Sequence, residues 1–288
     1  MITAFTRPRT LAEAVSQLHQ AGDEGRIVAG GTALILMIQH GLVDPSVLIS
    51  LDQVGGPSYR GIDLAGPHLR IGGGQTLAEV ASSPLVRTPL PSLATACRQV
   101  GNIRIRNRAT LGGNLAEADY ASDPPAVLIA HQAVCRTLSP DGERLIPVGE
   151  LITGFYETSL LPAEIITEVL IPLPAPGTRS SYLKYTSRSS QDRPCVGVAV
   201  NLRIDNGAVA DLGVVVGAVC HTPQYYPEVC AKAVGRPADS RTWSEVAARY
   251  AERVNPLDDA RGSAWYRTRM VKVIVHRALT EAARKDRP

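Results

Sequence analysis

The sequence lacks the closely spaced cysteines that bind iron–sulfur clusters and structural zinc. Its five cysteines are Cys97, Cys135, Cys195, Cys220 and Cys230, and none forms a C-x-x-C pair. An odd number without tight spacing argues against a disulfide framework and favours a reducing compartment, where thiols are by default buried and inert. A metal site at Cys220, His221 and Cys230 is disfavoured because the usual zinc spacing is absent. The chain therefore has no ligand set of its own for a metal or an iron–sulfur cluster.

Long apolar runs and a dominant charge are absent as well. The apolar run over 33–38 is far too short to cross a bilayer, and the first residues have no apolar core after a basic start, unlike a signal peptide. A formal net charge of +3 over 288 residues is too small to indicate nucleic-acid binding. We therefore expect a globular, cytoplasmic protein with no membrane span and no nucleic-acid partner.

The first part of the chain, residues 1 to about 55, has the pattern of a small α/β unit. Thr10 and Glu13 form a capping box at the start of a helix that Gly22 ends. A strand over 26–31, a helix over 32–41 and a strand over 46–51 complete the expected unit.

The rest of the chain divides into a second unit, to residue 176, and a region over 178–288. The second unit is expected to contain a strand ending in the glycines 72–74, helices from Thr76, over 89–100 and over 121–133, a hairpin turned at 140–142, and a strand over 164–174. The proline-rich range 172–181 is the candidate linker. Beyond it, strands with a hairpin turn at 205–207 precede helices over 242–254 and 263–285. The expected fold class is α+β.

Three arginines alternate along the chain at Arg104, Arg106 and Arg108. On a strand their side chains would share one face. That face could be a solvated edge or a stripe that meets phosphate, and the sequence does not choose between these alternatives.

The strongest motifs are two glycine pairs beside a threonine, in "VAGGTAL" over 28–34 and "ATLGGN" over 109–114. Glycine lets backbone N–H groups approach an anion, and the hydroxyls of Thr32 and Thr110 can donate to phosphate oxygens. Two such segments could form two walls around the pyrophosphate of a dinucleotide, although each could also be a tight turn. The glycines at 72–74 lack the last glycine of G-x-G-x-x-G, and no acidic residue follows at the Rossmann distance.

At these residues the sequence resembles a known family, the FAD-binding medium subunits of the molybdenum hydroxylases, which include carbon monoxide, nicotine and xanthine dehydrogenases. The similarity runs through the first glycine segment, "VGNIRIRNRATLGGNLAEADYASDPPAVLIAHQA", "FYETSLLPAEIITEVLIPLP", "YLKYTSRSSQD" and "DDARGSAWYRTRMVKVIVHRAL". It therefore covers nearly the whole chain, and the two glycine motifs in tandem are specific.

The resemblance implies a fold and a set of cofactor contacts. It implies a two-subdomain FAD-binding domain of the vanillyl-alcohol oxidase (PCMH) type over 1–176, divided at about residue 55, and a carbon monoxide dehydrogenase flavoprotein-like α+β domain over 178–288. The implied FAD contacts are Ile27, Val28, Ala29, Gly30, Gly31, Thr32, Ala33, Leu34, Val100, Thr110, Leu111, Gly112, Gly113, Asn114, Asp123, Ile166 and Lys184. No catalytic residue is implied on this chain.

Several of these residues have a competing structural explanation. Asp123 matches an acid at the cofactor's sugar region, but it also stands where a helix N-cap is expected. Lys184 matches a lysine near the flavin ring, but it could be an exposed strand lysine. Asn114 could simply adopt a left-handed conformation after the glycines. Val100 occupies a position that can be aromatic in the animal enzymes.

The implied function is electron transfer within a larger complex. In the family, substrate is oxidised at a molybdopterin cofactor in a large subunit, and electrons pass through two [2Fe–2S] clusters of a small subunit to FAD. A dimer of such heterotrimers is expected. The acceptor stays open among NAD, quinone, cytochrome and oxygen, although Gln191 replaces an acidic residue that lies near nicotinamide in the animal enzymes. The alternatives are a self-contained flavin oxidoreductase of the same superfamily and a flavin-free scaffold subunit.

Overall fold

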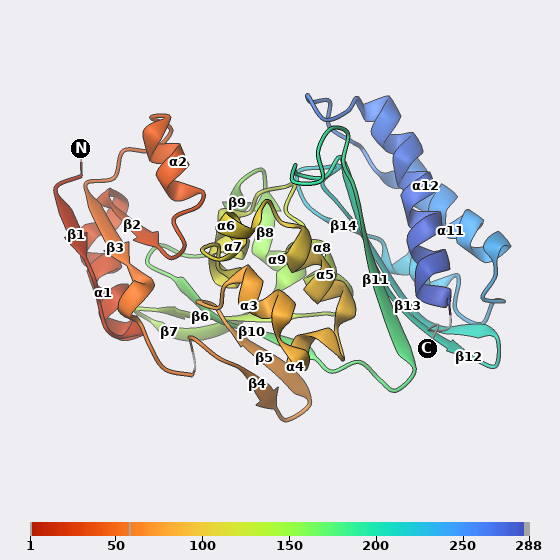
Figure 1. Cartoon of the computed structure of the whole chain (residues 1–288), viewed down its shortest axis with the longest axis horizontal. Coiled ribbons are helices and arrows are strands. Elements are labelled where there is room, and N and C mark those ends of the chain that lie inside the picture. Colours follow the sequence, from red (N-terminus) through yellow and green to blue (C-terminus); the bar gives the residue numbers. More distant parts are fainter. Residues whose placement is uncertain (1, 58, 285–288) are drawn as a thin grey trace.

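The computed structural model describes residues 2–57 and 59–284, so that Lys285, the last residue of the expected C-terminal helix, lies outside the described residues. Figure 1 shows the three larger sheets side by side along the long axis of the molecule, with the N-terminal sheet on the left and the C-terminal sheet on the right. Helices accompany each sheet, and the expected α+β class is confirmed. No helix in the described ranges has the length and hydropathy needed to cross a membrane.

The N-terminal sheet is parallel, in the order β1-β3-β2. The elements are β1 (Ala4–Thr6), α1 (Leu11–Ala21), β2 (Gly25–Val28), α2 (Leu34–Gln39) and β3 (Val47–Ser50), with 3-10 turns at Gly22–Glu24 and Leu51–Gln53. The predicted capping box is present, because the Thr10 hydroxyl accepts from the Glu13 N–H and the Glu13 side chain accepts from the Thr10 N–H. Strand β1 was not predicted.

The middle sheet is antiparallel, in the order β4-β5-β10-β6-β7. Its strands are β4 (Ile62–Ala65), β5 (His68–Gly72), β6 (Val134–Ser139), β7 (Gly142–Pro147) and β10 (Ile165–Pro172). The accompanying elements are α3 (Leu77–Ser82), α4 (Pro84–Arg87), α5 (Pro91–Gln99), α6 (Ile103–Arg106), α7 (Leu111–Glu117), α8 (Pro124–Ala130), α9 (Val148–Leu151), β8 (Ile152–Gly154) and β9 (Glu157–Thr158). Strand β10 is central and mostly buried, and apolar residues flank its two polar residues, Thr167 and Glu168.

The arginine alternation does not lie on a strand. Arg104 and Arg106 belong to the helical turn α6, and Arg108 follows it. The Asn102 side chain caps this turn by accepting from the N–H groups of Arg104 and Ile105. The expected shared face is therefore wrong, because a local cap fixed a helical turn where the side-chain pattern suggested a strand.

The C-terminal sheet is antiparallel, in the order β11-β12-β13-β14. Its elements are β11 (Thr178–Tyr185), β12 (Val196–Asp205), β13 (Ala208–Gly217), β14 (Gln224–Tyr225), α10 (Pro227–Ala231), α11 (Ser240–Arg253) and α12 (Ala264–Ala283). Asn206 and Gly207 both have positive φ, as the predicted two-residue hairpin turn requires. Strand β11 begins inside the predicted linker 172–181, so the connection from β10 comprises only 173–177.

Helices cover both faces of this sheet. Tyr182 of β11, Ala199 of β12 and Val215 of β13 share a buried core with α5 and α8. Val198 and Val214 face the opposite way and pack in the core formed with α11 and α12. The middle and C-terminal regions consequently share one apolar core. This core holds β11 next to the start of α8 and the end of α5.

Candidate functional site

The two glycine motifs lie against each other, as the sequence suggested. A side chain at Gly30 would collide with the main chain of Arg108, immediately before the second motif. A Cβ built on Gly113 would lie 3.7 Å from the Cβ of Ala29 in the first motif. Glycine at position 30 therefore permits the close approach of two loop backbones, one after β2 and one between α6 and α7.

The glycine run 72–74, which had no assigned function, supports the second motif from behind. A Cβ on Gly112 would lie 3.0 Å from the Cα of Gly73, and a Cβ on Gly73 would lie 2.5 Å from the carbonyl oxygen of Ile166. Three segments thus pack main chain to main chain at this point. The requirement for close packing could have been suspected from the run itself, but the identity of its neighbours could not.

A small cavity opens where these segments meet. Its volume is about 80 Å³, and its lining is largely apolar. The residues that line it are Ile27, Ala29, Leu51, Tyr59, Gly112, Gly113, Ala116, Leu160, Glu164, Ile165 and Ile166. Five predicted cofactor contacts, from three separate parts of the chain, therefore surround one space. Tyr59, Leu160 and Glu164 line the same space and carried no motif that would have identified them.

The two motifs differ in what their N–H groups do. In the second motif Leu111 donates to the Gln75 carbonyl, Gly112 to the Gly73 carbonyl, and Gly113 to the Thr110 hydroxyl. Thr110 is thereby the N-cap of α7. These donors are consequently engaged within the protein, and the second motif contributes shape rather than free N–H groups.

The first motif keeps its donors available. Within the described part of the chain, no acceptor pairs with the main-chain N–H groups of Gly30, Gly31, Thr32 and Ala33, all of which are half-buried residues. Gly31 has a φ of +72°, which turns consecutive N–H groups toward one side in the manner of an anion-binding nest. The first motif is therefore the segment that can bind a phosphate group.

Asp123 and Lys184 form a second, polar part of the site. The Lys184 ammonium donates to Asp123 Oδ2 at 2.9 Å and to the Gln99 carbonyl at 2.9 Å, and the Tyr182 hydroxyl donates to Asp123 Oδ1 at 2.6 Å. Asp123 occupies the N-cap position of α8, as the sequence suggested, but its side chain makes no capping bond there. The exposed-lysine interpretation is wrong, because only 4% of the Lys184 side chain is accessible.

Burial dominates the electrostatics of this cluster. It raises the pKa of the Asp123 carboxyl, an effect that the Lys184 ammonium and the Tyr182 hydroxyl oppose. It also raises the pKa of Tyr182, with Asp123 adding to the shift, so that the hydroxyl remains a donor. Tyr182 lacked a motif, but its position two residues before Lys184 places both side chains on one face of β11.

One hydrogen bond connects the polar cluster to the second glycine motif. The Ser122 hydroxyl donates to Asn114 Oδ1 at 2.8 Å, directly before Asp123 in the chain. Asn114 lies within α7 and does not have positive φ, so the left-handed interpretation of this residue is wrong. Val100 follows Gln99 at the end of α5 and packs against the shared core. The Asp123–Lys184 pair is therefore linked to the second glycine motif through Ser122.

The segment of residues 186–195, between β11 and β12, borders the candidate site on its C-terminal side. Arg193 pairs with Asp119 at 2.7 Å, just beyond α7. Gln191 donates its N–H to the Ser189 hydroxyl within the segment itself. The fully buried Arg267 donates to the carbonyl of Cys195 at 2.9 Å and holds the segment's end against α12. This segment is thus fastened at its end and next to α7.

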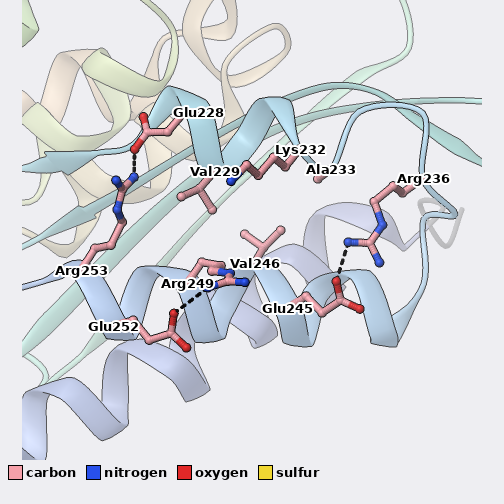
Figure 2. A pocket seen from close by; sticks show the side chains of 10 residues that line it. All are labelled: Glu228, Val229, Lys232, Ala233, Arg236, Glu245, Val246, Arg249, Glu252 and Arg253. Atoms are coloured by element: carbon pink, nitrogen blue, oxygen red, sulfur yellow. Dashed lines mark hydrogen bonds and ion pairs between the residues drawn. The ribbon is translucent and has the colours of Figure 1, made fainter.

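A larger cavity, of about 340 Å³, lies elsewhere, between α10 and α11. Figure 2 shows that each carboxylate in it faces an arginine: Glu228 faces Arg253, Glu245 faces Arg236 at 2.6 Å, and Glu252 faces Arg249 at 3.1 Å. None of the predicted contacts lines it. Charges that neutralise one another on a solvated surface indicate a structural network rather than a binding site.

The five cysteines are free and buried, as expected. Cys220 donates to the Asn255 carbonyl, and the Cys230 sulfur lies 3.5 Å from the Tyr250 hydroxyl. The described residues contain no group of three side chains arranged to hold a metal ion.

Comparison with known proteins gives matches over nearly the whole chain. The family model of the FAD binding domain in molybdopterin dehydrogenase matches residues 1–174, and that of the CO dehydrogenase flavoprotein C-terminal domain matches residues 181–282. The chain is 32% identical to the nicotine 6-hydroxylase medium subunit of Paenarthrobacter nicotinovorans, over 96% of both proteins. It is 30% identical to the carbon monoxide dehydrogenase medium chain of Hydrogenophaga pseudoflava, again over 96% of both.

The structural comparison agrees with the sequence comparison. A chain of carbon monoxide dehydrogenase from Hydrogenophaga pseudoflava, solved in a form that lacks the Mo-pyranopterin moiety of the molybdenum cofactor, matches with a TM-score of 0.94. The match has 31% sequence identity and covers 98% of this chain and 97% of that chain.

Proposed function

Because the chain belongs to the family of FAD-binding medium subunits of the molybdenum hydroxylases, we propose that it binds FAD and carries electrons within a complex of three different subunits. In this proposal a large partner oxidises the substrate at a molybdopterin cofactor. A small partner passes the electrons through two [2Fe–2S] clusters to the FAD of this chain, which delivers them to an external acceptor. Two such heterotrimers associate, and the complex is cytoplasmic.

The observation that carries the proposal is the connection of both glycine motifs to a buried charged pair. Gly30 and Gly113 bring the motifs together, and the Ser122–Asn114 hydrogen bond joins them to Asp123 and Lys184. A tight turn needs no such connection, whereas a dinucleotide needs a phosphate site, an apolar wall and polar groups within one region.

The residues of this chain fit the cofactor in distinct ways. The free N–H groups over 30–33 would hold a phosphate group, and the aliphatic lining with Ile27 and Ile166 would pack against the apolar parts. Asp123 has lone pairs left to accept from sugar hydroxyls, since two donors among the described residues reach its carboxylate. Bound FAD would supply an acceptor that exchanges electrons singly or in pairs.

Lys184 would set the electrostatic environment of the cofactor. Its ammonium has a third N–H beyond the two that Asp123 and Gln99 receive. Because Asp123 offsets much of the positive charge, the pair acts as an oriented dipole whose position is fixed by Tyr182. Such a dipole can favour negative charge on a neighbouring group without placing an isolated charge in the interior.

The need for partners follows from what this chain contains. Its cysteines are buried and widely spaced, so the clusters that deliver electrons to the flavin must belong to another subunit. The relatives are named as medium chains or medium subunits, which supports a larger and a smaller partner for this chain as well.

A direct test is the flavin content of the purified full chain. We expect visible flavin absorption, release of FAD rather than FMN on denaturation, and co-purification with the large and small partners when the three are expressed together. A colourless protein that does not bind added FAD would support the scaffold alternative. Oxidation of a small substrate by the isolated chain would support the self-contained flavoenzyme.

A further inference from the structure

The side chain of Gln99 carries a buried polar atom without a partner. Gln99 is the last residue of α5, and its Oε1 is inaccessible to solvent and has no hydrogen bond within the described residues. Gln99 Oε1 is therefore a buried acceptor that finds no donor within the described residues.

Buried polar groups without partners are rare, because they lose their hydrogen bonds to water and gain none. Methionine or leucine at the end of α5 would avoid this loss. A glutamine at this place is therefore explained best by a group that the isolated chain does not contain.

The position of Gln99 indicates what that group is. Its main-chain carbonyl accepts from Lys184, which is paired with Asp123, and the next residue is Val100. Two other atoms in the described ranges share the same state, Ser159 Oγ and Asn201 Oδ1, and neither takes part in the hydrogen bonds of this cluster. Gln99 is thus the residue with an unpaired atom that adjoins the expected cofactor contacts Lys184 and Val100 and, through Lys184, Asp123.

We infer that Gln99 is a further contact of the cofactor, and that its side-chain amide exchanges a hydrogen bond with bound FAD. This inference rests on the proposed function. It adds a residue that neither the glycine motifs nor the charged pair indicated.

Two measurements on the full chain test the inference, the dissociation constant of FAD and the urea midpoint of the flavin-free protein. Gln99→Met removes the polar end while it preserves the length of the side chain. We expect the dissociation constant to rise roughly three- to tenfold, as for the loss of one hydrogen bond. We expect the urea midpoint of the flavin-free protein to stay the same or rise, because an unpaired polar atom has been removed. Gln20→Met, on the exposed face of α1, is the matched control and should change neither quantity.

Weaker FAD binding together with unchanged or higher stability separates a cofactor contact from a structural residue. An unchanged dissociation constant in Gln99→Met would overturn the inference, as would a lower urea midpoint with unchanged affinity, which would assign the partner to a buried water or to the protein. If Gln99→Met does not fold, Gln99→Leu is measured in the same way and judged by the same outcomes. Failure of the unaltered chain to bind FAD would instead refute the proposed function, and the two failures are therefore distinguishable.

Discussion

Lys184 and Asp123 form an ion pair of 2.9 Å in which only 4% of each side chain is exposed. The two residues are 61 positions apart, one on β11 and the other at the start of α8. Burying two charges is costly, and the cost is recovered only when each charge keeps its partner. The pair therefore links the C-terminal sheet to the middle region and makes each residue dependent on the other.

Removing one member of this pair should be far more harmful than removing both charges. We expect Lys184→Met to lower the free energy of unfolding by about 3–5 kcal/mol, since it leaves the Asp123 carboxylate buried without its cation. The double variant Asp123→Asn/Lys184→Met should recover a large part of that loss. Urea unfolding of both variants and of Asp123→Asn completes a double-mutant cycle.

Lys232→Met is the matched control for this cycle, because Lys232 is exposed. It should change the free energy of unfolding by less than about 0.5 kcal/mol. Additive effects of the two single substitutions would contradict the coupling that the geometry indicates.

His131 should make the stability of the protein depend on pH. Burial lowers its pKa from 6.5 to about 4, so the folded protein keeps this imidazole neutral while the unfolded chain takes up a proton below pH 6.5. Stability from this residue is complete above pH 6.5 and is lost as the pH falls toward 4. Between pH 7.5 and pH 5 the loss amounts to about 2 kcal/mol.

The measurement is urea unfolding at both pH values, in the unaltered chain and in His131→Gln. The glutamine can keep a hydrogen bond to Ser92, which contacts the ring nitrogen at 3.2 Å, but it does not titrate. The difference in stability between the two proteins should shift by the stated amount between the two pH values. A pH-independent difference between the unaltered chain and His131→Gln would refute the assignment.

Gly113 should be needed for flavin retention. A Cβ there would lie 2.8 Å from the Thr110 hydroxyl and would enter the space beside Ala29, where both motifs line the cavity. We expect Gly113→Val to remain folded, by circular dichroism, but to lose bound FAD. Gly55→Val, at a glycine with open space around it, should retain FAD, and normal flavin content in Gly113→Val would count against the site.

Local features of the fold were predictable from the sequence because they depend on a few neighbouring residues. The capping box of Thr10 and Glu13 and the hairpin turn at Asn206 and Gly207 both involve contacts within four residues, and both are present. The glycine motifs were recognisable for a similar reason, since their composition alone signals close approach of main chain.

The parts that were missed or misjudged depend on distant contacts. Asp123 has the sequence of an N-cap, but Tyr182 and Lys184 compete for its carboxylate from β11. The glycines at 72–74 have no pattern of their own, and their function depends on Gly112 and Ile166. No property of the sequence near Gln99 indicates that its amide oxygen is buried without a partner.

Thr110 should differ from Thr10 although both residues cap helices through their hydroxyls. Loss of either cap, in Thr110→Ala or Thr10→Ala, should lower the free energy of unfolding by about 1 kcal/mol in urea titrations. Only Thr110 stands beside Gly113 at the meeting of the two motifs, so only Thr110→Ala should also weaken FAD binding, by roughly three- to tenfold in a fluorescence titration. Equal FAD affinity in the two variants would mean that Thr110 serves its helix alone and that phosphate binding rests entirely on the free N–H groups of the first motif.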